Sequence, residues 1–395
     1  MSDNYQDLFP PYPGIQVDNI NPVPVPVDHP NDPTNTSNDT THLDKPKIQH
    51  AYVKSVDNSF VPDFPSLNPS DFETIKILGT GDVGKVYLVR LKGFSGYEQL
   101  YAMKVIDLED VRRRNKSTRI ETEKNILQSI SHPFIVKLYC TYKSEKFFYF
   151  LMEYCPGGEF FRVLQHQPHR CISEAHAKFY AAEVLNAIEY LHAVGIVYRD
   201  LKPENIMIHK SGHIRLADFD LSKQLEEKNI DEHKPKYIFS FLDRFDKDEQ
   251  KRLHAMKAFV GTAEYLSPEV ITGVGYSPLV DWWALGILVY EMLFGRTPFK
   301  GGDNEGTFNH IIRGTFVIPK ENAHGPISKQ CQDLIKRLLT ADVHSRLGHK
   351  NGGAEIREHA FFKDVDCLMI QYQIPPIKPH IESIFDTRHF SGDKG

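Results

Sequence analysis

The chain has 395 residues, of which 41% are hydrophobic and 25% charged, and its formal net charge is -5 at pH 7. This length is too great for one compact domain of ordinary size and allows two lobes with flanking segments. The mild negative charge excludes a basic nucleic-acid footprint, and no apolar run approaches the roughly 20 residues of a membrane span.

The N-terminal segment, residues 1 to about 68, differs in composition from the rest of the chain. It is rich in Pro, Asn and Asp, and the run from Pro22 to Val27 alternates Pro with Val. A segment of this kind buries too little apolar surface to offset the entropy lost on ordering. We therefore expect residues 1–68 to be disordered.

From Asp71 onward, short runs of β-branched and aromatic residues are typical of strands. After Gly157 and Gly158 the chain becomes helical, with Ser173 as the expected N-cap of an amphipathic helix that ends at His192. A strand-rich small lobe followed by a helical lobe predicts an α+β fold, with the functional site in the cleft between the lobes. The expected strands are residues 72–78, 85–90, 100–106, 135–142 and 147–154, with one charged helical stretch between the third and the fourth.

A second stretch of unusual composition spans residues 224 to about 256. Glu, Lys and Asp dominate it, with a few apolar residues such as Ile238 and Phe241. Loops of this length without secondary structure are uncommon in compact domains and are usually regulatory or disordered. We expect an inserted, largely exposed loop.

A glycine-rich turn joins the first two expected strands. A Gly-x-Gly-x-x-Gly pattern is weak by itself, since an ordinary glycine turn explains it about as well as a phosphate loop does. Here it joins two strands, which disfavours a dinucleotide-binding fold, and the missing side chains allow backbone N–H groups to approach phosphates. The stretch comprises Gly79, Thr80, Gly81, Asp82, Val83, Gly84, Lys85 and Val86.

Lys104 lies in the third expected strand, where a buried ammonium group is costly unless it is paired. Glu123, on the charged helical stretch that follows, is the candidate partner. Together they would hold the α- and β-phosphates of a nucleotide. Two unrelated solvated charges would explain this pair equally well if it stood alone.

The segment from Tyr198 to Asn205, followed by Asp218, decides the functional interpretation. Phosphoryl transfer requires a positioned hydroxyl, charge neutralisation and a metal, but little covalent chemistry from the protein. Asp200 would accept a hydrogen bond from the attacking hydroxyl, and Lys202 would neutralise the transferring phosphoryl group. Asn205 and Asp218 carry oxygen ligands of the type that Mg²⁺ prefers. These residues predict ATP and Mg²⁺ as cofactors.

In these motifs, the chain from about Asp71 to Phe390 resembles the AGC group of Ser/Thr protein kinases. The stretch from Ser267 to Glu269 occupies the place of the group's Ala-Pro-Glu motif, and Asp281 that of the helical Asp that braces the catalytic loop. The resemblance implies a bilobal kinase fold that transfers the ATP γ-phosphoryl group to Ser or Thr hydroxyls of proteins. It implies a kinase domain at residues 69–362, with a small lobe at about 69–155 and a large lobe at about 156–362, and a truncated AGC-type tail at 363–395.

The resemblance also assigns residues around the nucleotide. Val86, Ala102 and Met207 would sandwich the adenine ring, and Met152 would be the gatekeeper. Glu153 and Cys155 would present hinge backbone groups to the adenine edge. The remaining residues assigned to the nucleotide are Glu159 and, from the tail, Phe390.

Substrate selection is implied by acidic positions in the same resemblance. Glu159, Glu204 and Glu291 occupy places where basophilic members receive Arg residues upstream of the phosphoacceptor. Carboxylates bind guanidinium groups in a bidentate, geometrically selective way, although any one of these acids could be an ordinary surface charge. The residues assigned to the acceptor side are Phe259, Thr262, Ala263 and Leu266.

Two departures from the group's pattern stand out. Asp220 replaces the usual Gly after Asp218 and Phe219, and with the long insertion it resembles the branch of plant phototropin-type and fungal flippase kinases. Ala258 stands where the group has a phosphorylatable Ser or Thr, yet the basic residues that would bind that phosphate are present. They are Arg119, Arg199 and Lys223. We hypothesise that another anion or acid orders the activation loop.

Two other functional classes remain as alternatives. A pseudokinase scaffold has its best support in Ala258 and Asp220, whereas the intact catalytic set counts against it; that set is Lys104, Asp200, Asn205 and Asp218. A small-molecule phosphotransferase is disfavoured by the complete segment from Ser267 to Glu269 and by the protein-substrate acids. The chain has 5 cysteines, widely spaced, and no signal pattern, so we expect a cytoplasmic location in a reducing compartment. We expect a monomer whose partners are protein substrates with basic motifs; an upstream kinase and peripheral association with the plasma membrane are left open.

Overall fold

The computed structural model describes residues 64–81, 84–93, 100–225, 262–379, 381–383 and 386–392. Nearer the N-terminus it describes only the backbone of three short strands, which are β1 (Gln16–Asp18), β2 (Tyr52–Lys54) and β3 (Phe60–Pro62). The rest of the segment that we expected to be disordered lies outside the described residues, as does the expected insertion beyond residue 225.

The small lobe is built on a six-stranded sheet with the order β1-β7-β8-β6-β5-β4, in which every neighbouring pair is antiparallel. Its long strands are β4 (Phe72–Thr80), β5 (Gly84–Leu91), β6 (Leu100–Asp107), β7 (Leu138–Lys143) and β8 (Phe147–Glu153). All five expected strands are present. The fourth begins later than predicted, because Ile135 instead bridges to Leu216 of the large lobe.

The charged stretch after β6 forms two helices, where the sequence predicted one. These are α1 (Leu108–Arg113) and α2 (Ser117–Ser129). The Asp107 carboxylate caps α1 by accepting hydrogen bonds from the backbone N–H groups of Glu109 at 2.8 Å and Asp110 at 3.3 Å. Asn115 has a φ of 54°, a left-handed conformation that interrupts the helix before α2 begins.

Residues 64–68, which we assigned to the N-terminal segment, are folded onto the small lobe. Phe64 and Leu67 are buried, and the Phe64 ring lies 5.4 Å from that of Tyr101 and 4.7 Å from that of Tyr139. The Tyr142 hydroxyl donates a hydrogen bond to the Phe64 carbonyl at 3.1 Å. Apolar burial therefore orders the chain before the boundary that composition predicted.

The large lobe is helical. The helix predicted from Ser173 is confirmed as α4, and the Ser173 hydroxyl accepts a hydrogen bond from the backbone N–H of His176 at 3.3 Å. The helices are α3 (Phe160–Gln165), α4 (Glu174–Ala193), α6 (Pro268–Ile271), α7 (Leu279–Phe294), α8 (Asn304–Arg313), α9 (Lys329–Leu338) and α10 (Gly352–Arg357). Short strand pairs join β9 (Ile196–Val197) to β12 (Lys223–Gln224), β10 (Ile206–Ile208) to β11 (Ile214–Leu216), and β13 (Glu321–Asn322) to β14 (Gly325–Pro326).

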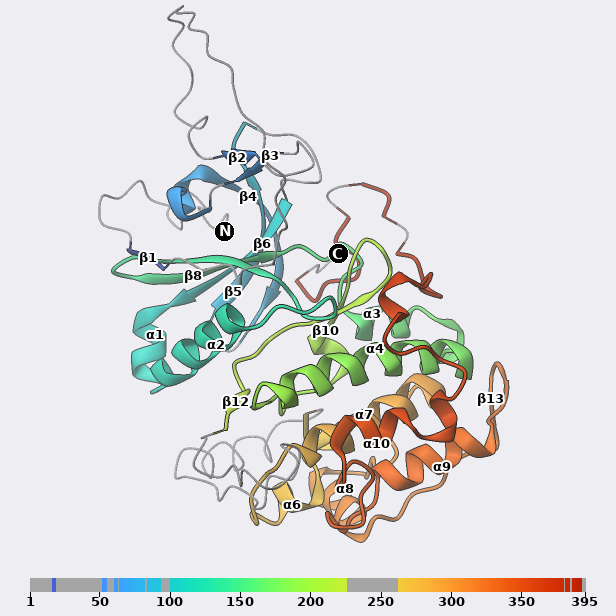
Figure 1. The fold of residues 1–395 in the computed structure, drawn as a ribbon. Coiled ribbons are helices and arrows are strands. Elements are labelled where there is room, and N and C mark those ends of the chain that lie inside the picture. Colours follow the sequence, from blue (N-terminus) through green and yellow to red (C-terminus); the bar gives the residue numbers. More distant parts are fainter. Residues whose placement is uncertain are drawn as a thin grey trace, which may run out of the picture.

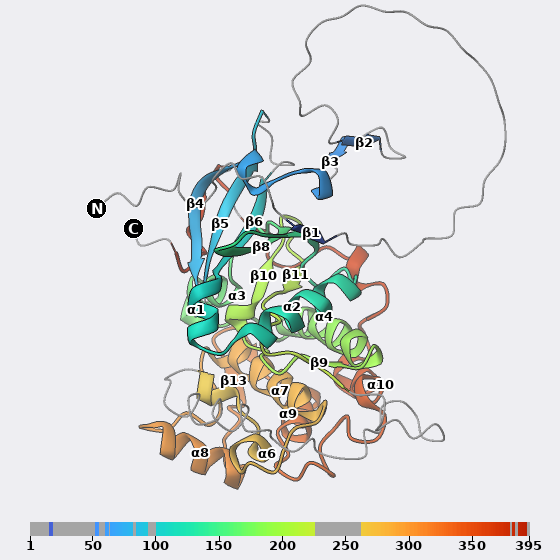
Figure 2. The ribbon, with the colours of Figure 1, turned by 90° about the vertical axis from the view of Figure 1, so that its left-hand side faces the viewer.

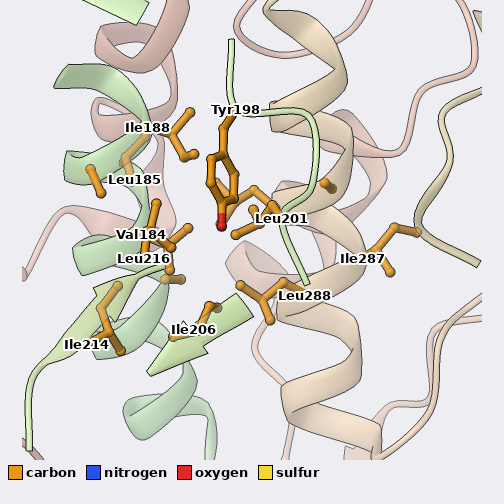
Figure 3. Close-up of a cluster of buried hydrophobic side chains, with 14 of the residues drawn as sticks. Val184, Leu185, Ile188, Tyr198, Leu201, Ile206, Ile214, Leu216, Ile287 and Leu288 are labelled. Atoms are coloured by element: carbon orange, nitrogen blue, oxygen red, sulfur yellow. The ribbon is translucent and has the colours of Figure 1, made fainter. Parts of the chain in front are cut away.

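The core of the large lobe supports the loop that follows β9. Figure 3 shows Tyr198 directed into the space between α4 and α7, with Leu201 and Ile206 beside it. Leu185 and Ile188 of α4 and Leu288 of α7 belong to the same buried cluster. The loop after Tyr198 is therefore held on a rigid apolar base.

The two lobes lie one above the other, with β10 and β11 near their junction (Figure 1 and Figure 2). The C-terminal segment, drawn in red, rises from the helical lobe to the level of the small lobe (Figure 1). Among the described residues, no helix combines the length and apolar character that a membrane crossing requires.

Candidate active site

A cavity of about 400 Å³ lies where the two lobes meet. Both lobes and the C-terminal segment line it. The lining includes Gly79, Thr80, Gly81, Gly84, Val86, Ala102, Lys104, Glu123, Met152, Glu153, Tyr154, Cys155, Glu159, Glu204, Asn205, Met207, Asp218, Asp220, Phe390 and Ser391. Most residues that the sequence assigned to the nucleotide therefore come together in one place.

The glycine-rich turn between β4 and β5 covers one side of this cavity. Gly79 pairs with Val86 and Thr80 with Lys85 across the hairpin. A side chain at Gly84 would overlap the carbonyl oxygen of Val105, so the strands can approach this closely only with glycine there. Asp82 and Val83 lie outside the described residues, and Lys85 is exposed and does not line the cavity.

Lys104 and Glu123 form the expected ion pair. The Lys104 Nζ lies 2.7 Å from Glu123 Oε1 and 2.9 Å from Oε2, and 3.3 Å from Oδ1 of Asp218. Burial alone would lower the pKa of Lys104. The carboxylates of Asp218 and Glu123 raise this pKa by more than burial lowers it, so the net shift is upward. The ammonium group is therefore charged and fixed at the wall of the cavity.

Asp200 lies at the centre of the loop after β9 and is buried. The Lys202 Nζ donates to both of its carboxylate oxygens, at 3.1 and 3.0 Å, and the Asn205 side-chain nitrogen donates to Oδ2 at 2.6 Å. Burial raises the pKa of Asp200 to about 6; Lys202 opposes the rise and Asp218 adds to it. The carboxylate is thus held in one orientation by two donors.

The side chain of Asp281, on α7, fixes the backbone of this loop by hydrogen bonding. Its fully buried carboxylate accepts hydrogen bonds from the backbone N–H groups of Tyr198 at 2.9 Å and Arg199 at 2.7 Å, and from His192 Nε2 at 2.8 Å. Arg199 and Asp218 have φ values of 65° and 56°, in the strained left-handed region. The hydrogen bonds from Tyr198 and Arg199 to the charged Asp281 carboxylate stabilise the left-handed conformation at Arg199.

Apolar side chains form the inner end of the cavity. Val86, Ala102 and Met207 pack in one cluster with Tyr154 and Phe390. The rings of Tyr154 and Phe390 are stacked, with centroids 6.0 Å apart and an interplanar angle of 18°. This arrangement suits a flat, apolar ligand such as a purine ring.

The side chains of Glu153 and Cys155, in the predicted hinge, are engaged or buried. The carboxylate of Glu153 accepts a hydrogen bond from Arg215 Nε at 3.0 Å and is turned toward the large lobe. Burial raises the pKa of the Cys155 thiol, so it is not a nucleophile. Met152 lies next to this segment at the cavity wall.

The C-terminal segment forms a strap across the cavity that sequence reasoning found only in part. Glu159 donates its backbone N–H to the His389 carbonyl at 2.9 Å, and its Oε1 accepts from the Ser391 N–H at 3.0 Å. Gly392 donates to the Leu78 carbonyl of β4 at 2.9 Å. Phe390 was predicted, whereas Ser391 and Gly392 bind through the backbone and carry no sequence signal.

The predicted substrate acids are electrostatically coupled, and two of them, Glu159 and Glu204, line the cavity, whereas Glu291 does not. Burial raises the pKa of Glu204, and the carboxylates of Glu159 and Glu264 contribute to the rise. Burial raises the pKa of Glu291 to about 7; the Tyr265 hydroxyl, 2.5 Å away, opposes this rise, whereas Glu204 and Glu264 add to it.

The acceptor side is only partly described. Ala263 and Leu266 are buried. Phe259 and Ala258 lie outside the described residues, and of Thr262 only the backbone, at the start of a 3-10 turn, is described.

The donor set fits a magnesium ion. The Asn205 side-chain nitrogen is committed to Asp200, so its carbonyl oxygen is the atom left for a metal. Asp218 adds a carboxylate at the same cavity wall. One amide oxygen and one carboxylate suit Mg²⁺, which takes few protein ligands and completes its shell with phosphates and water.

A two-lobed fold with a buried lysine–glutamate pair and an Asp-Asn-Asp set at the cleft defines a phosphotransferase of the protein kinase type. A sequence model described as "Protein kinase domain" matches residues 72–362. The chain therefore belongs to the protein kinase domain family.

Comparison with curated proteins agrees with this assignment. The chain is 46% identical over 343 residues to "Flippase kinase 1" of Saccharomyces cerevisiae, covering 87% of this chain and 37% of that protein. It is 47% identical over 335 residues to "Serine/threonine-protein kinase nrc-2" of Neurospora crassa, covering 83% and 53%. It is 41% identical over 318 residues to "Phototropin-1A" of Oryza sativa subsp. japonica, covering 79% and 33%. The chain thus spans about half the length, or less, of these relatives, and their names confirm its resemblance to AGC Ser/Thr kinases of the flippase-kinase and phototropin branch.

Proposed function

We propose that the chain is a protein Ser/Thr kinase that transfers the γ-phosphoryl group of ATP to proteins carrying basic residues upstream of the acceptor. The observation that carries this proposal is that Lys104, Asn205 and Asp218 line one cavity, with Asp200 hydrogen-bonded to Asn205 beside it and Lys104 already paired with Glu123. This is the arrangement that positioning and charge neutralisation in phosphoryl transfer require.

Nucleotide binding follows from the two ends of the cavity. The purine would enter the apolar end between Val86, Ala102 and Met207, with Phe390 closing the edge. The charged Lys104 would hold the α- and β-phosphates at the other end. When bound between Asn205 and Asp218, Mg²⁺ would supply further charge neutralisation.

Asp200 would orient the attacking hydroxyl. The substrate oxygen forms a bond to the γ-phosphorus while the bond to the β-phosphate oxygen breaks, which releases ADP. The hydroxyl proton would pass to the Asp200 carboxylate. Lys202, whose Nζ lies 3.0 Å from Oδ2 of Asp200, would neutralise the transferring group. With a pKa of about 6, Asp200 is ionised at neutral pH, and this pKa is near enough to neutral pH for the carboxylate to accept a proton.

Selection of basic substrates is supported by the electrostatic coupling of the predicted acids. The pKa values of Glu204 and Glu291 are raised mainly by burial, and neighbouring carboxylates add to the rise. An arginine side chain would offset both effects by supplying a paired positive charge. Glu159 lies close enough to contribute to the same field. We therefore expect a guanidinium group to bind more strongly here than at isolated surface acids.

A reducing location is supported by the cysteines. All of them are buried and none forms a disulfide. We therefore propose a cytoplasmic location, where protein substrates are accessible.

The direct test of substrate class is phosphate transfer from Mg·ATP to matched peptides. A Ser peptide with Arg upstream should be phosphorylated faster than the same peptide with Ala upstream, and a Tyr acceptor should remain unmodified. The double variant Glu204→Gln with Glu291→Gln should reduce the preference for Arg. Phosphate found only on small metabolites, or on no acceptor, would contradict the proposal.

A further inference from the structure

Arg119 on α2 meets an acid that belongs to the metal-binding segment. Its NH1 lies 3.6 Å from Oδ2 of Asp220, and both side chains are about three-quarters buried, each with an exposed fraction of 24%. Arg119 precedes Glu123 by one helical turn, so the two side chains lie on the same face of α2. The ion pair thus joins the small-lobe helix to the large-lobe segment that carries Asp218.

We propose that Asp220 is a positioning residue that holds α2 through Arg119, so that Glu123 stays paired with Lys104. This role rests on the proposed kinase function. The carboxylate is a permanent part of the Asp-Phe-Asp segment, so α2 is held in place without a phosphate on the activation loop. Ala258 has no hydroxyl to carry such a phosphate.

The contacts around Asp220 form a closed circuit. Lys104 binds Glu123 at 2.7 Å and Asp218 at 3.3 Å, and Arg119 connects the same helix to Asp220, two residues beyond Asp218. Movement of α2 would have to break both ion pairs together. A glycine at position 220 would remove the pair with Arg119 and leave the contacts that Lys104 makes with Glu123 and Asp218.

The turn that carries Asp220 is itself fixed. The Ser222 backbone N–H donates to the Phe219 carbonyl at 3.1 Å, and its hydroxyl donates to the Tyr198 carbonyl at 3.1 Å. Phe219 packs edge-on against Tyr198, with centroids 5.1 Å apart. Asp220 is therefore presented from a rigid support rather than from a flexible loop.

The other two basic residues that the sequence assigned to a loop phosphate make different contacts. The Arg199 guanidinium carbon lies 4.3 Å from the ring centre of Tyr276, and the Lys223 Nζ lies 4.9 Å from it. Arg199 Nε also donates to the Leu221 carbonyl at 2.7 Å. Arg119 is thus the member of the trio that an acid of the Asp-Phe-Asp segment engages.

The test compares variants of both partners in phosphatase-treated protein. Asp220→Asn and Arg119→Gln should each lower kcat roughly 3- to 30-fold, with the KM for a basic Ser peptide unchanged. The kcat of the double variant should be no lower than that of the less active single variant, because both substitutions remove the same interaction. Asp220→Glu and Arg119→Lys should restore most of the activity. Asp364→Asn, in the exposed pair with Lys178, is the matched control and should leave kcat unchanged.

A second readout does not depend on catalysis. Amide hydrogen exchange over residues 117–129 should be faster by roughly tenfold in Asp220→Asn than in wild type, and unaltered in Asp364→Asn. Unchanged exchange and full activity in Asp220→Asn would overturn the inference, as would losses that multiply in the double variant. Wild-type activity that disappears on phosphatase treatment would assign the anchor to a phosphate instead. An inactive wild type would contradict the proposed kinase function, and the exchange measurement would still decide the role of Asp220.

Discussion

Replacement of Asp281 by Ala is expected to destabilise the protein and to disable its catalytic loop together. The carboxylate is completely buried and accepts three hydrogen bonds, two of them from the backbone of Tyr198 and Arg199. Each buried donor left without a partner costs about 1–3 kcal/mol. Because water can enter the space left by the side chain and satisfy part of the loss, we expect the free energy of unfolding to fall by about 3–5 kcal/mol.

Asp281→Asn separates the contributions of charge and shape. The amide keeps one acceptor oxygen but turns a donor toward a backbone N–H, so we expect a loss of about 1–3 kcal/mol. In both variants kcat should fall by at least about tenfold under conditions where the protein remains folded, because Asp200 follows directly after the released backbone.

Urea unfolding followed by tryptophan fluorescence is the suitable assay. The chain contains 2 tryptophans, Trp282 and Trp283, and both are buried directly after Asp281 on α7. Asp364→Ala, which removes an exposed ion pair with Lys178, is the control and should change stability by less than about 1 kcal/mol. An Asp281→Ala variant with wild-type midpoint and wild-type kcat would refute the reasoning.

Three further predictions concern the nucleotide cavity, the substrate acids and a buried ion pair. Phe390→Ala should raise the KM for ATP roughly 3- to 10-fold because a stacked aromatic wall is lost, whereas Leu368→Ala, which alters a tail residue that is 74% exposed, should not. Because the pKa of Glu291 is raised to about 7, its negative charge is lost as the pH falls through 7; the ratio of kcat/KM for Arg and Ala peptides should therefore decline below pH 7, and Glu291→Gln should flatten this dependence. Glu269→Ala leaves the buried Arg346 guanidinium without its bidentate partner and should lower the free energy of unfolding by about 3–5 kcal/mol in a urea titration.

Most of the site could be predicted because its chemistry is carried by short motifs. Lys104, Asp200, Asn205 and Asp218 were expected from residue types at fixed spacing. Lys104, Asn205 and Asp218 line one cavity, and Asp200 is hydrogen-bonded to Asn205. The strands were predictable because β-branched and aromatic runs alternate with turn residues. Lys85 was included only because it lies within the glycine-rich stretch, and side-chain direction on the hairpin excludes it from the cavity.

The features that sequence reasoning missed depend on contacts between distant segments. Phe64 and Leu67 are ordered by burial against the small lobe, which a Pro-rich composition conceals. Ser391 reaches Glu159 through its backbone N–H, for which any residue type would serve. The acid that pairs with Arg119 was left unassigned, because nothing in the sequence shows that the turn after Phe219 points toward α2.

The break between α1 and α2 was missed for a local reason. Asp107 is a good N-cap, but it also ends a strand, and the charged residues that follow favour one continuous helix. The left-handed Asn115 then divides the stretch. Local propensity alone does not decide between one helix and two.

The proposed roles of Asp200 and Asp218 are tested most directly by measuring Mg·ATP binding and phosphate transfer in the same preparations of wild type, Asp200→Asn and Asp218→Ala. Asp200→Asn should bind Mg·ATP like wild type and lose at least about 100-fold in kcat toward a basic Ser peptide. Asp218→Ala should lose both metal-dependent nucleotide binding and transfer. Wild-type protein that fails to bind Mg·ATP, or an Asp218→Ala variant with undiminished turnover, would contradict these roles.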